Sequence, residues 1–420
     1  MGSGHATSSG STDLYAISKR RQASVDELTS KLGRQWLLDA VAKDIPHPLV
    51  DLYREYTMCG GHANLFAENT GCARLAFAAA DVTAAWDVLT SLRGGESALR
   101  RDMQSTNEVW GVLGEAFVAV ELGSAGVEVR PGEVGRGRSP DLLALSDGNV
   151  KAEVEAKVRH YSANDRESWR FWKNLYERLE PHLRNSGWAC EIDYAEKCPP
   201  FELLEPLAMT ISERLAAPCH QFKMDFQSFG VRARRLAGLR TNPRDLLIQV
   251  ERLGEFAVFE GAVRPLPTFA GRLDHAVSCW RRRSGGHLAG LRRCMRNAGK
   301  KFSGTHPSLV VVLLSDEVAS AVWKSAASPS GALFDLANAF AGYLKRTYFK
   351  RAPNVSEVRL YVQSFPLVDG VVERHVGCFG VRNEKALHPL SQGFGLKSAS
   401  DFEWIRGPAE EDINGKSNRN

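Results

Sequence analysis

The chain has 420 residues, of which 43% are hydrophobic and 25% are charged, so wholesale disorder, collagen and a long coiled coil are excluded. The length predicts two or three domains, and no apolar run approaches the about 20 residues that a membrane span needs, so we expect no membrane partner. The net charge of +5 is uneven, because residues 221–301 hold 17 Lys and Arg against 6 Asp and Glu. This local excess suggests a polyanionic partner, and a solvated basic surface is the alternative.

The first residues are small and polar without an apolar signal segment, and we expect a disordered start over residues 1–12. The eight cysteines form no CxxC pair and no zinc-type cluster with histidine, which favours free thiols and a cytoplasmic protein. Residues 13–100 have apolar side chains every three or four positions and predict a helical N-terminal domain. This domain carries no chemical motif, and it is where we expect a homo-oligomer contact or a protein partner.

A mixed succession of helices and strands is predicted from residue 101 onward. Residues 105–123 begin with capping residues and predict an amphipathic helix that carries Glu115. Short strands are then expected at residues 126–130, 139–145 and 150–159. The last of these (VKAEVEAKVR) alternates strictly, and the preceding Asp147-Gly148-Asn149 is typical of a tight turn. The last two strands should therefore form a hairpin.

A long basic stretch interrupts this succession. We expect residues 162–299 to be a mostly helical basic insertion, with two weaker strand candidates at residues 188–194 and 255–261. The apolar run at residues 308–314 predicts a fully buried strand. Helices through residues 319–348 and two strands at residues 357–364 and 370–381 follow it. The predicted core thus consists of residues 101–161 and 300–385, and residues 386–420 are expected to be a C-terminal extension and tail.

Ionisable side chains share one face of the strand predicted at residues 150–159. Because side chains alternate along a strand, Glu153, Glu155 and Lys157 point the same way, opposite a row of alanine and valine. Asp141 lies on the neighbouring hairpin strand, so its carboxylate can approach that of Glu155. Two carboxylates with an amine nearby suit a hard divalent cation. The alternative is a solvated sheet face with an ion pair.

The motif Pro140-Asp141, thirteen residues and then Glu155-Ala156-Lys157 resembles the signature of the PD-(D/E)xK nuclease superfamily. The predicted order of helix, three strands, helix and strand is also similar to the core of that superfamily, and the resemblance covers residues 105–160 and 300–380. It implies an α/β fold with a restriction-endonuclease-like core, in which helices flank a mixed central sheet. The helical N-terminal domain and the basic insertion would be additions to this core.

The resemblance also implies a role for each residue of the motif. Asp141 and Glu155 would bind Mg²⁺ or Mn²⁺ through their carboxylates, with the backbone carbonyl of Ala156 as a third ligand. Lys157 would orient or activate the attacking water, and Glu115 would assist metal binding from the first helix. A divalent cation held in this way offsets the charge that develops when a phosphodiester is hydrolysed.

The basic stretch supplies the predicted nucleic-acid contacts. Residues 287–300 predict a helix on which Arg292, Arg296 and Lys300 recur at a spacing of four. The full set of predicted phosphate-binding residues is Arg281, Arg282, Arg283, Arg292, Arg293, Arg296 and Lys300. Phosphate contacts supply affinity without reading sequence. Arginines that extend their charged ends into solvent around an apolar helix stripe are the alternative.

We therefore expect a Mg²⁺-dependent phosphodiesterase, most simply a DNA endonuclease in restriction or phage defence, with RNA open as the other substrate. The alternative is a nucleic-acid-binding or scaffold protein with a catalytically degenerate nuclease-like core. The presence of Asp141, Glu155 and Lys157 together favours activity. A third possibility is a carboxylate-rich sheet unrelated to nucleases, with a basic region that binds RNA.

Overall fold

The computed structural model describes residues 9–58, 70–132, 139–160, 163–183, 188–194, 199–235, 256–261, 275–281, 286–315, 318–319, 329–368, 371–391, 394 and 403–406. The chain divides into two compact units, each with its own hydrophobic core. The first unit comprises residues 1–159, 294–316 and 341–420, and the second comprises residues 160–293 and 317–340. Most of the predicted insertion lies in the second unit.

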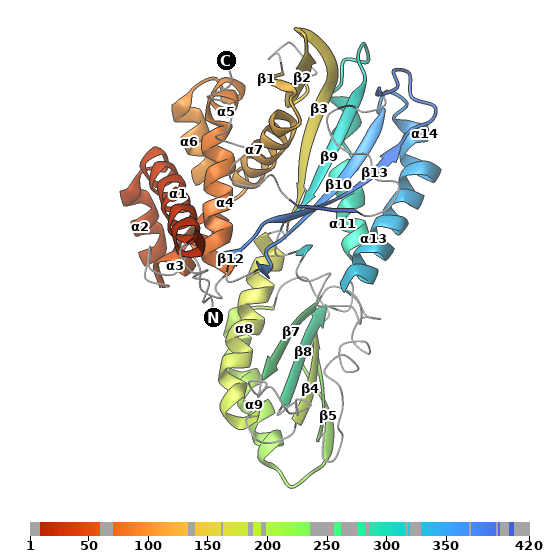
Figure 1. Cartoon of the computed structure of the whole chain (residues 1–420). Helices are drawn as coiled ribbons and strands as arrows, with labels where there is room; N and C mark the ends of the chain where they lie inside the picture. Colours follow the sequence, from red (N-terminus) through yellow and green to blue (C-terminus); the bar gives the residue numbers. More distant parts are fainter. Residues whose placement is uncertain are drawn as a thin grey trace, which may run out of the picture. The chain divides into compact units, whose positions relative to one another are not determined.

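Helices fill the part of the first unit that precedes its sheet (Figure 1). They are α1 (Ser9–Leu32), α2 (Arg34–Ala42), α3 (Pro48–Met58), α4 (Thr70–Ala84), α5 (Trp86–Arg93), α6 (Glu96–Gln104) and α7 (Val109–Ser124). The helical prediction for residues 13–100 agrees with these elements. Helix α1 already begins at Ser9, inside the expected disordered start, and residues 1–8 lie outside the described residues.

The N-terminal helices share one hydrophobic core with the sheet and are not a separate domain. Helix α4 is apolar on nearly all sides and contacts α1, α3 and α7. A helix with this composition has to be buried on more than one side, so it joins the outer helices to α7 and the sheet. The expected division between residues 13–100 and the core is therefore not observed.

The first unit is built on a mixed seven-stranded sheet. In spatial order its strands are β1 (Glu128–Pro131), β2 (Leu142–Ser146), β3 (Asn149–Arg159), β9 (Ser308–Leu314), β10 (Glu357–Ser364), β13 (His375–Arg382) and β14 (Glu403–Arg406). Strand β9 runs parallel to both β3 and β10, and the other neighbouring strands are antiparallel. A mixed α/β fold with a central sheet and flanking helices is confirmed.

The hairpin of β2 and β3 forms as predicted, with Leu142 opposite Val154. Its turn places Asp147 and Gly148 at φ angles of 52° and 77°. Positive φ angles at both central residues match the twist of a two-residue hairpin, and the pair Asp-Gly favours this conformation. The turn thereby pairs Ser146 with Asn149 and Leu145 with Val150, and a register shift between Leu145 and Ala144 then moves the pairing by one residue.

The second unit contains a five-stranded sheet, in which the strand candidates at residues 188–194 and 255–261 of the predicted insertion both form and three further strands were not expected. In spatial order its strands are β5 (Gln221–Phe226), β6 (Phe229–Arg235), β4 (Trp188–Tyr194), β8 (His275–Arg281) and β7 (Phe256–Gly261). Helices α8 (Ala163–Leu183) and α9 (Leu204–Ala216) pack on its apolar face, and a 3-10 turn, η2 (Phe201–Leu203), precedes α9. In β6 the buried apolar residues Phe229, Val231 and Ala233 recur at every second position, which is a strand pattern.

The remaining elements connect the strands. They are α11 (Gly286–Met295), the 3-10 turn η3 (Ala298–Lys300), α13 (Pro329–Tyr343), the π-helix η4 (Leu344–Tyr348), α14 (Phe349–Arg351), β11 (Leu367–Val368) and β12 (Val371–Val372). Strands β11 and β12 pair with each other in a small antiparallel hairpin. Along the described residues no single helix is long and apolar enough to cross a membrane, and the bent pair α4 and α5 meets that test by length and composition only.

Helix α7 lies so close to β3 that a glycine is required at the contact. A Cβ atom added to Gly114 would approach Cγ2 of Val158 to 2.4 Å. We expect Gly114→Ala to lower the free energy of unfolding by about 1–3 kcal/mol, because overpacking forces side chains or backbone to shift. The measurement is urea denaturation.

Gly111 provides the matched control on the same helix. Among the described residues nothing lies within 4 Å of a Cβ at Gly111, so Gly111→Ala should leave stability unchanged or raise it by up to about 1 kcal/mol. The double change Gly114→Ala with Val158→Ala should recover part of the loss. Equal stability of Gly114→Ala and Gly111→Ala would contradict the close approach.

Candidate active site

The motif residues meet where β3 extends beyond its antiparallel neighbour. The β2–β3 ladder ends at the pair Leu142 and Val154, and β3 continues to Arg159. Asp141 directly precedes β2, and its Oδ2 accepts the backbone N–H of Ala156 at 3.0 Å. This bond takes the place of a ladder hydrogen bond and holds the Asp141 carboxylate beside β3.

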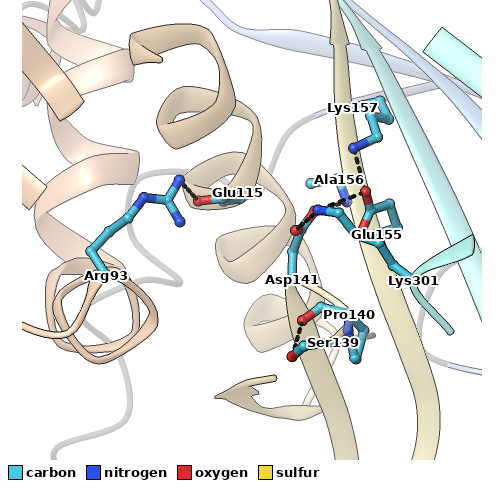
Figure 2. A network of polar contacts seen from close by, with 9 residues as sticks. All are labelled: Arg93, Glu115, Ser139, Pro140, Asp141, Glu155, Ala156, Lys157 and Lys301. Atoms are coloured by element: carbon cyan, nitrogen blue, oxygen red, sulfur yellow. Dashed lines mark hydrogen bonds and ion pairs between the residues drawn. The ribbon is translucent and has the colours of Figure 1, made fainter. Parts of the chain in front are cut away.

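Two carboxylates converge on one ammonium group (Figure 2). The Nζ atom of Lys301 lies 2.8 Å from Oδ1 of Asp141 and 3.0 Å from Oε1 of Glu155. Lys157 forms an ion pair with the same Glu155 oxygen. Asp141, Glu155 and Lys157 therefore lie together, and both acids are within reach of a single positive charge.

Glu155 is completely buried, which excludes the simple alternative of a solvated sheet face. Burial and the charge of Asp141 raise its carboxyl pKa to about 7, against the opposing effect of Lys157 and Lys301. Its Oε2 atom has no hydrogen-bond partner in the part of the chain that the structure describes. A buried carboxylate with an unpartnered oxygen favours an additional positive group.

Lys301 is the site residue that sequence reasoning missed. Burial lowers the pKa of its ammonium, but the charges and hydrogen bonds of Asp141 and Glu155 outweigh this effect and raise the pKa to about 12. Lys301 precedes β9, the strand that pairs in parallel with β3. In the sequence, the indication of a role for Lys301 is its position shortly before the predicted buried strand. The segment contains many other lysines and arginines, so this indication is not specific.

Glu153 lies two residues before Glu155 but has a different partner. Its carboxylate accepts the backbone N–H of Ser303 at 2.8 Å and the hydroxyl of the same residue. The backbone N–H of Glu153 in turn donates to the carbonyl of Pro307 at 2.9 Å. Glu153 thus anchors the segment that follows Lys301, and the structure gives it a structural role.

Glu115 is buried near the motif but turns toward a different residue. Its Oε2 atom lies 2.6 Å from Nη2 of Arg93, whose Nε also contacts Asp102 at 2.9 Å. Burial, together with the charge of Asp141, raises the pKa of Glu115 to about 7 against the opposing effect of Arg93. Figure 2 shows Glu115 directed at Arg93, apart from the contacts that join Asp141, Glu155 and Lys301.

The donor set fits a magnesium or manganese ion only if the ammonium of Lys301 moves away. Across the described residues, no group of three or more His, Cys, Asp or Glu is placed to hold a metal. Mg²⁺ needs few protein carboxylates, however, because it keeps several waters. The carboxylates of Asp141 and Glu155 and the carbonyl of Ala156 would supply oxygen ligands of the right kind.

The predicted phosphate-binding residues divide into three groups. Arg281 ends β8 in the second unit, and Arg282 and Arg283 lie outside the described residues. Arg292 and Arg293 are exposed on α11. Arg296 and Lys300 are exposed as well, but they follow the end of that helix.

The helix predicted over residues 287–300 is therefore too long. It ends at Met295, and Lys300 belongs to a 3-10 turn. Asn297 and Gly299 have weak helix propensity, which accounts for an end at this position. The predicted stacking of Arg292, Arg296 and Lys300 along one helix face is wrong, although all three remain exposed.

Comparison with known protein families finds no family model that matches the chain. A comparison with curated proteins finds no match either. The case for a function accordingly rests on the geometry and chemistry of Asp141, Glu155, Lys157 and Lys301.

The raised pKa values predict a stability that falls as pH rises. Glu115 and Glu155 have a pKa of about 7 in the folded protein against an ordinary value of 4.5. Between these values the folded state binds more protons than the unfolded state, so the free energy of unfolding decreases with increasing pH. In Glu115→Gln this slope should become shallower by up to about 1.4 kcal/mol per pH unit.

Urea denaturation between about pH 5 and pH 7 measures this slope. Glu128→Gln is the control, because Glu128 lies on the surface and pairs with the exposed Arg130. The control should keep the wild-type slope. Equal slopes for Glu115→Gln and wild type would contradict the raised pKa of Glu115.

Proposed function

We propose that this protein is a Mg²⁺- or Mn²⁺-dependent nuclease of PD-(D/E)xK type, most simply a DNA endonuclease. The observation that carries the proposal is the contact of Asp141 and Glu155, from the start of β2 and the middle of β3, with one shared cationic group. The ion pair of Lys157 with the same Glu155 oxygen supports it. A role in restriction or phage defence stays a prediction.

The chain's own residues would each contribute to hydrolysis. Asp141 and Glu155 would hold the cation, with Asp141 kept in position by the N–H of Ala156. Lys157 would keep a positive charge beside the reacting phosphate and orient the attacking water. The bound cation would supply positive charge for the transition state and lower the pKa of water.

The direct test is incubation of the purified protein with supercoiled plasmid, linear duplex DNA and single-stranded RNA. Each substrate is combined with Mg²⁺, Mn²⁺ or EDTA. We expect cleavage of DNA with either metal and none with EDTA. Cleavage that persists in EDTA, or no cleavage of any substrate with either metal, would contradict the proposal.

A second candidate function is a nucleic-acid-binding protein with a catalytically degenerate nuclease-like core. The position of Lys301 favours it, because the ammonium already satisfies both carboxylates and could replace the cation permanently. The same experiment separates the two functions when it is combined with a binding assay. Binding of DNA without cleavage in any metal would support the degenerate core.

The exposed cations around α11 provide a prediction about binding alone. The triple change Arg292→Ala, Arg296→Ala and Lys300→Ala should reduce the slope of log K against log salt by about 0.9 per lost contact on duplex DNA. The measurement is a salt titration of DNA binding in Ca²⁺. Arg101→Ala, which removes an exposed arginine from α6, is the control and should leave the slope unchanged.

The loss of affinity in the triple variant should be similar for unrelated DNA sequences, because phosphate contacts carry no base information. An unchanged salt slope in this variant would show that these residues are ordinary solvated surface.

A further inference from the structure

Lys301 combines a fixed backbone with a side chain that reaches solvent. The neighbouring Phe302 is buried, and the backbone N–H of Ser303 is bonded to Glu153. The carbonyl of Gly304 lies 2.8 Å from Nε2 of His388. The Lys301 side chain itself is 43% exposed, so it can leave the carboxylates by rotation of its own bonds while its backbone stays in place.

The ammonium of Lys301 is also in the position where a shared cation would be bound. It contacts one oxygen of Asp141 and one oxygen of Glu155, at 2.8 and 3.0 Å. Both carboxylates lie within 3.0 Å of the same nitrogen atom, so they would repel each other without a positive group between them. Glu155 is also fully buried. Lys301 therefore stabilises the metal-free arrangement of both acids.

We propose that Lys301 is a built-in competitor of the divalent cation: it keeps the two carboxylates in place in the metal-free protein and has to swing out before they can bind a metal. This inference rests on the proposed function, because it assumes that Asp141 and Glu155 bind a metal. It assigns to Lys301 the control of metal affinity. If the site is free to bind metal in only a fraction of the molecules, the apparent metal affinity is the intrinsic affinity multiplied by that fraction.

The experiment compares Mn²⁺ binding by wild type, Lys301→Met and Lys151→Met, measured by electron paramagnetic resonance and titration calorimetry. Lys151 is the control, since it is an exposed lysine on the same strand as Glu155. We expect Lys301→Met to bind Mn²⁺ about tenfold more tightly than wild type. The energy of one charge-assisted hydrogen bond corresponds to about this change in a binding constant. Lys151→Met should bind like wild type.

Two further variants separate competition from general charge repulsion. Lys301→Arg keeps the positive charge and should retain the weak binding of wild type. Lys157→Met also removes a charge that contacts Glu155, but within the described residues this charge does not contact Asp141. Its gain in Mn²⁺ affinity should therefore be smaller than that of Lys301→Met. Equal gains for Lys157→Met and Lys301→Met would overturn direct competition.

A thermal unfolding measurement gives a readout that does not depend on cleavage. Without metal, Lys301→Met should unfold at a lower temperature than wild type, and saturating Mn²⁺ should raise its unfolding temperature by more than that of wild type. Equal Mn²⁺ affinities of wild type and Lys301→Met, with DNA cleavage intact, would overturn this inference alone. No Mn²⁺ binding by either protein would overturn both this inference and the proposed function.

Discussion

Glu155→Gln is expected to lower the rate of DNA cleavage by about a thousandfold or more, since a bound cation contributes several kcal/mol to transition-state stabilisation. Glutamine has nearly the same shape as glutamate but lacks the charge that would hold the cation. Because Glu155 is fully buried and burial already disfavours its charged form, the neutral amide should be tolerated by the fold. The measurement is the conversion of supercoiled plasmid to nicked and linear forms in Mg²⁺.

Related substitutions define the site more closely. Asp141→Asn and Lys157→Met should lower cleavage in the same direction, because each removes a charge from the same cluster. Glu128→Gln on the exposed strand β1 should cleave like wild type. Circular dichroism checks that every variant is folded, and full activity of folded Glu155→Gln would refute the assignment of this residue.

Arg374→Met should lower the free energy of unfolding by about 3–5 kcal/mol, which is the usual cost of leaving one partner of a buried ion pair uncompensated. The Nη1 atom of Arg374 lies 2.6 Å from Oδ2 of Asp81, and both side chains are less than one tenth exposed. The pair connects helix α4 to the segment before β13. Urea denaturation at neutral pH measures the loss.

An exposed ion pair provides the comparison. Arg130 and Glu128 are about half exposed, and Arg130→Met should cost at most about 1 kcal/mol. Replacing both Arg374 and Asp81 by apolar residues should recover part of the stability, since Asp81 is then no longer a buried charge without its arginine. A loss in Arg374→Met no larger than that in Arg130→Met would contradict the importance of this buried pair.

The elements that local sequence predicts are those whose signals lie within a few residues. The β2–β3 hairpin combines strict alternation with an Asp-Gly turn, so its formation and the shared side of Glu155 and Lys157 follow from the sequence, whereas the register shift between Ala144 and Leu145 does not. The buried strand β9 and strand β10 follow from apolar composition in the same way. The proximity of Asp141 and Glu155 was accessible because both strands belong to this hairpin, but the one-residue shift that sets their final register was not.

The features that sequence reasoning missed depend on contacts between distant segments. Lys301 reaches Glu155 only because β9 pairs with β3 in parallel, and no local pattern distinguishes it from neighbouring basic residues. Glu115 lies on the predicted helix, but its partner Arg93 comes from a separate one. In the second unit, strand β6 was not predicted because it lies within the basic stretch, although its apolar residues Phe229, Val231 and Ala233 recur at alternate positions.

The parallel pairing of β3 with β9 has a consequence for the order in which the protein is made. These adjacent strands are separated in the chain by nearly the whole second unit, which has a hydrophobic core of its own. Contacts between such distant segments close a long loop, which slows folding. If the second unit folds first, the flexible part of this loop becomes shorter. On the ribosome, Asp141, Glu155 and Lys157 leave the exit tunnel long before Lys301 and β9. A nascent or truncated chain that ends within the second unit thus carries all three motif residues but cannot complete the central sheet.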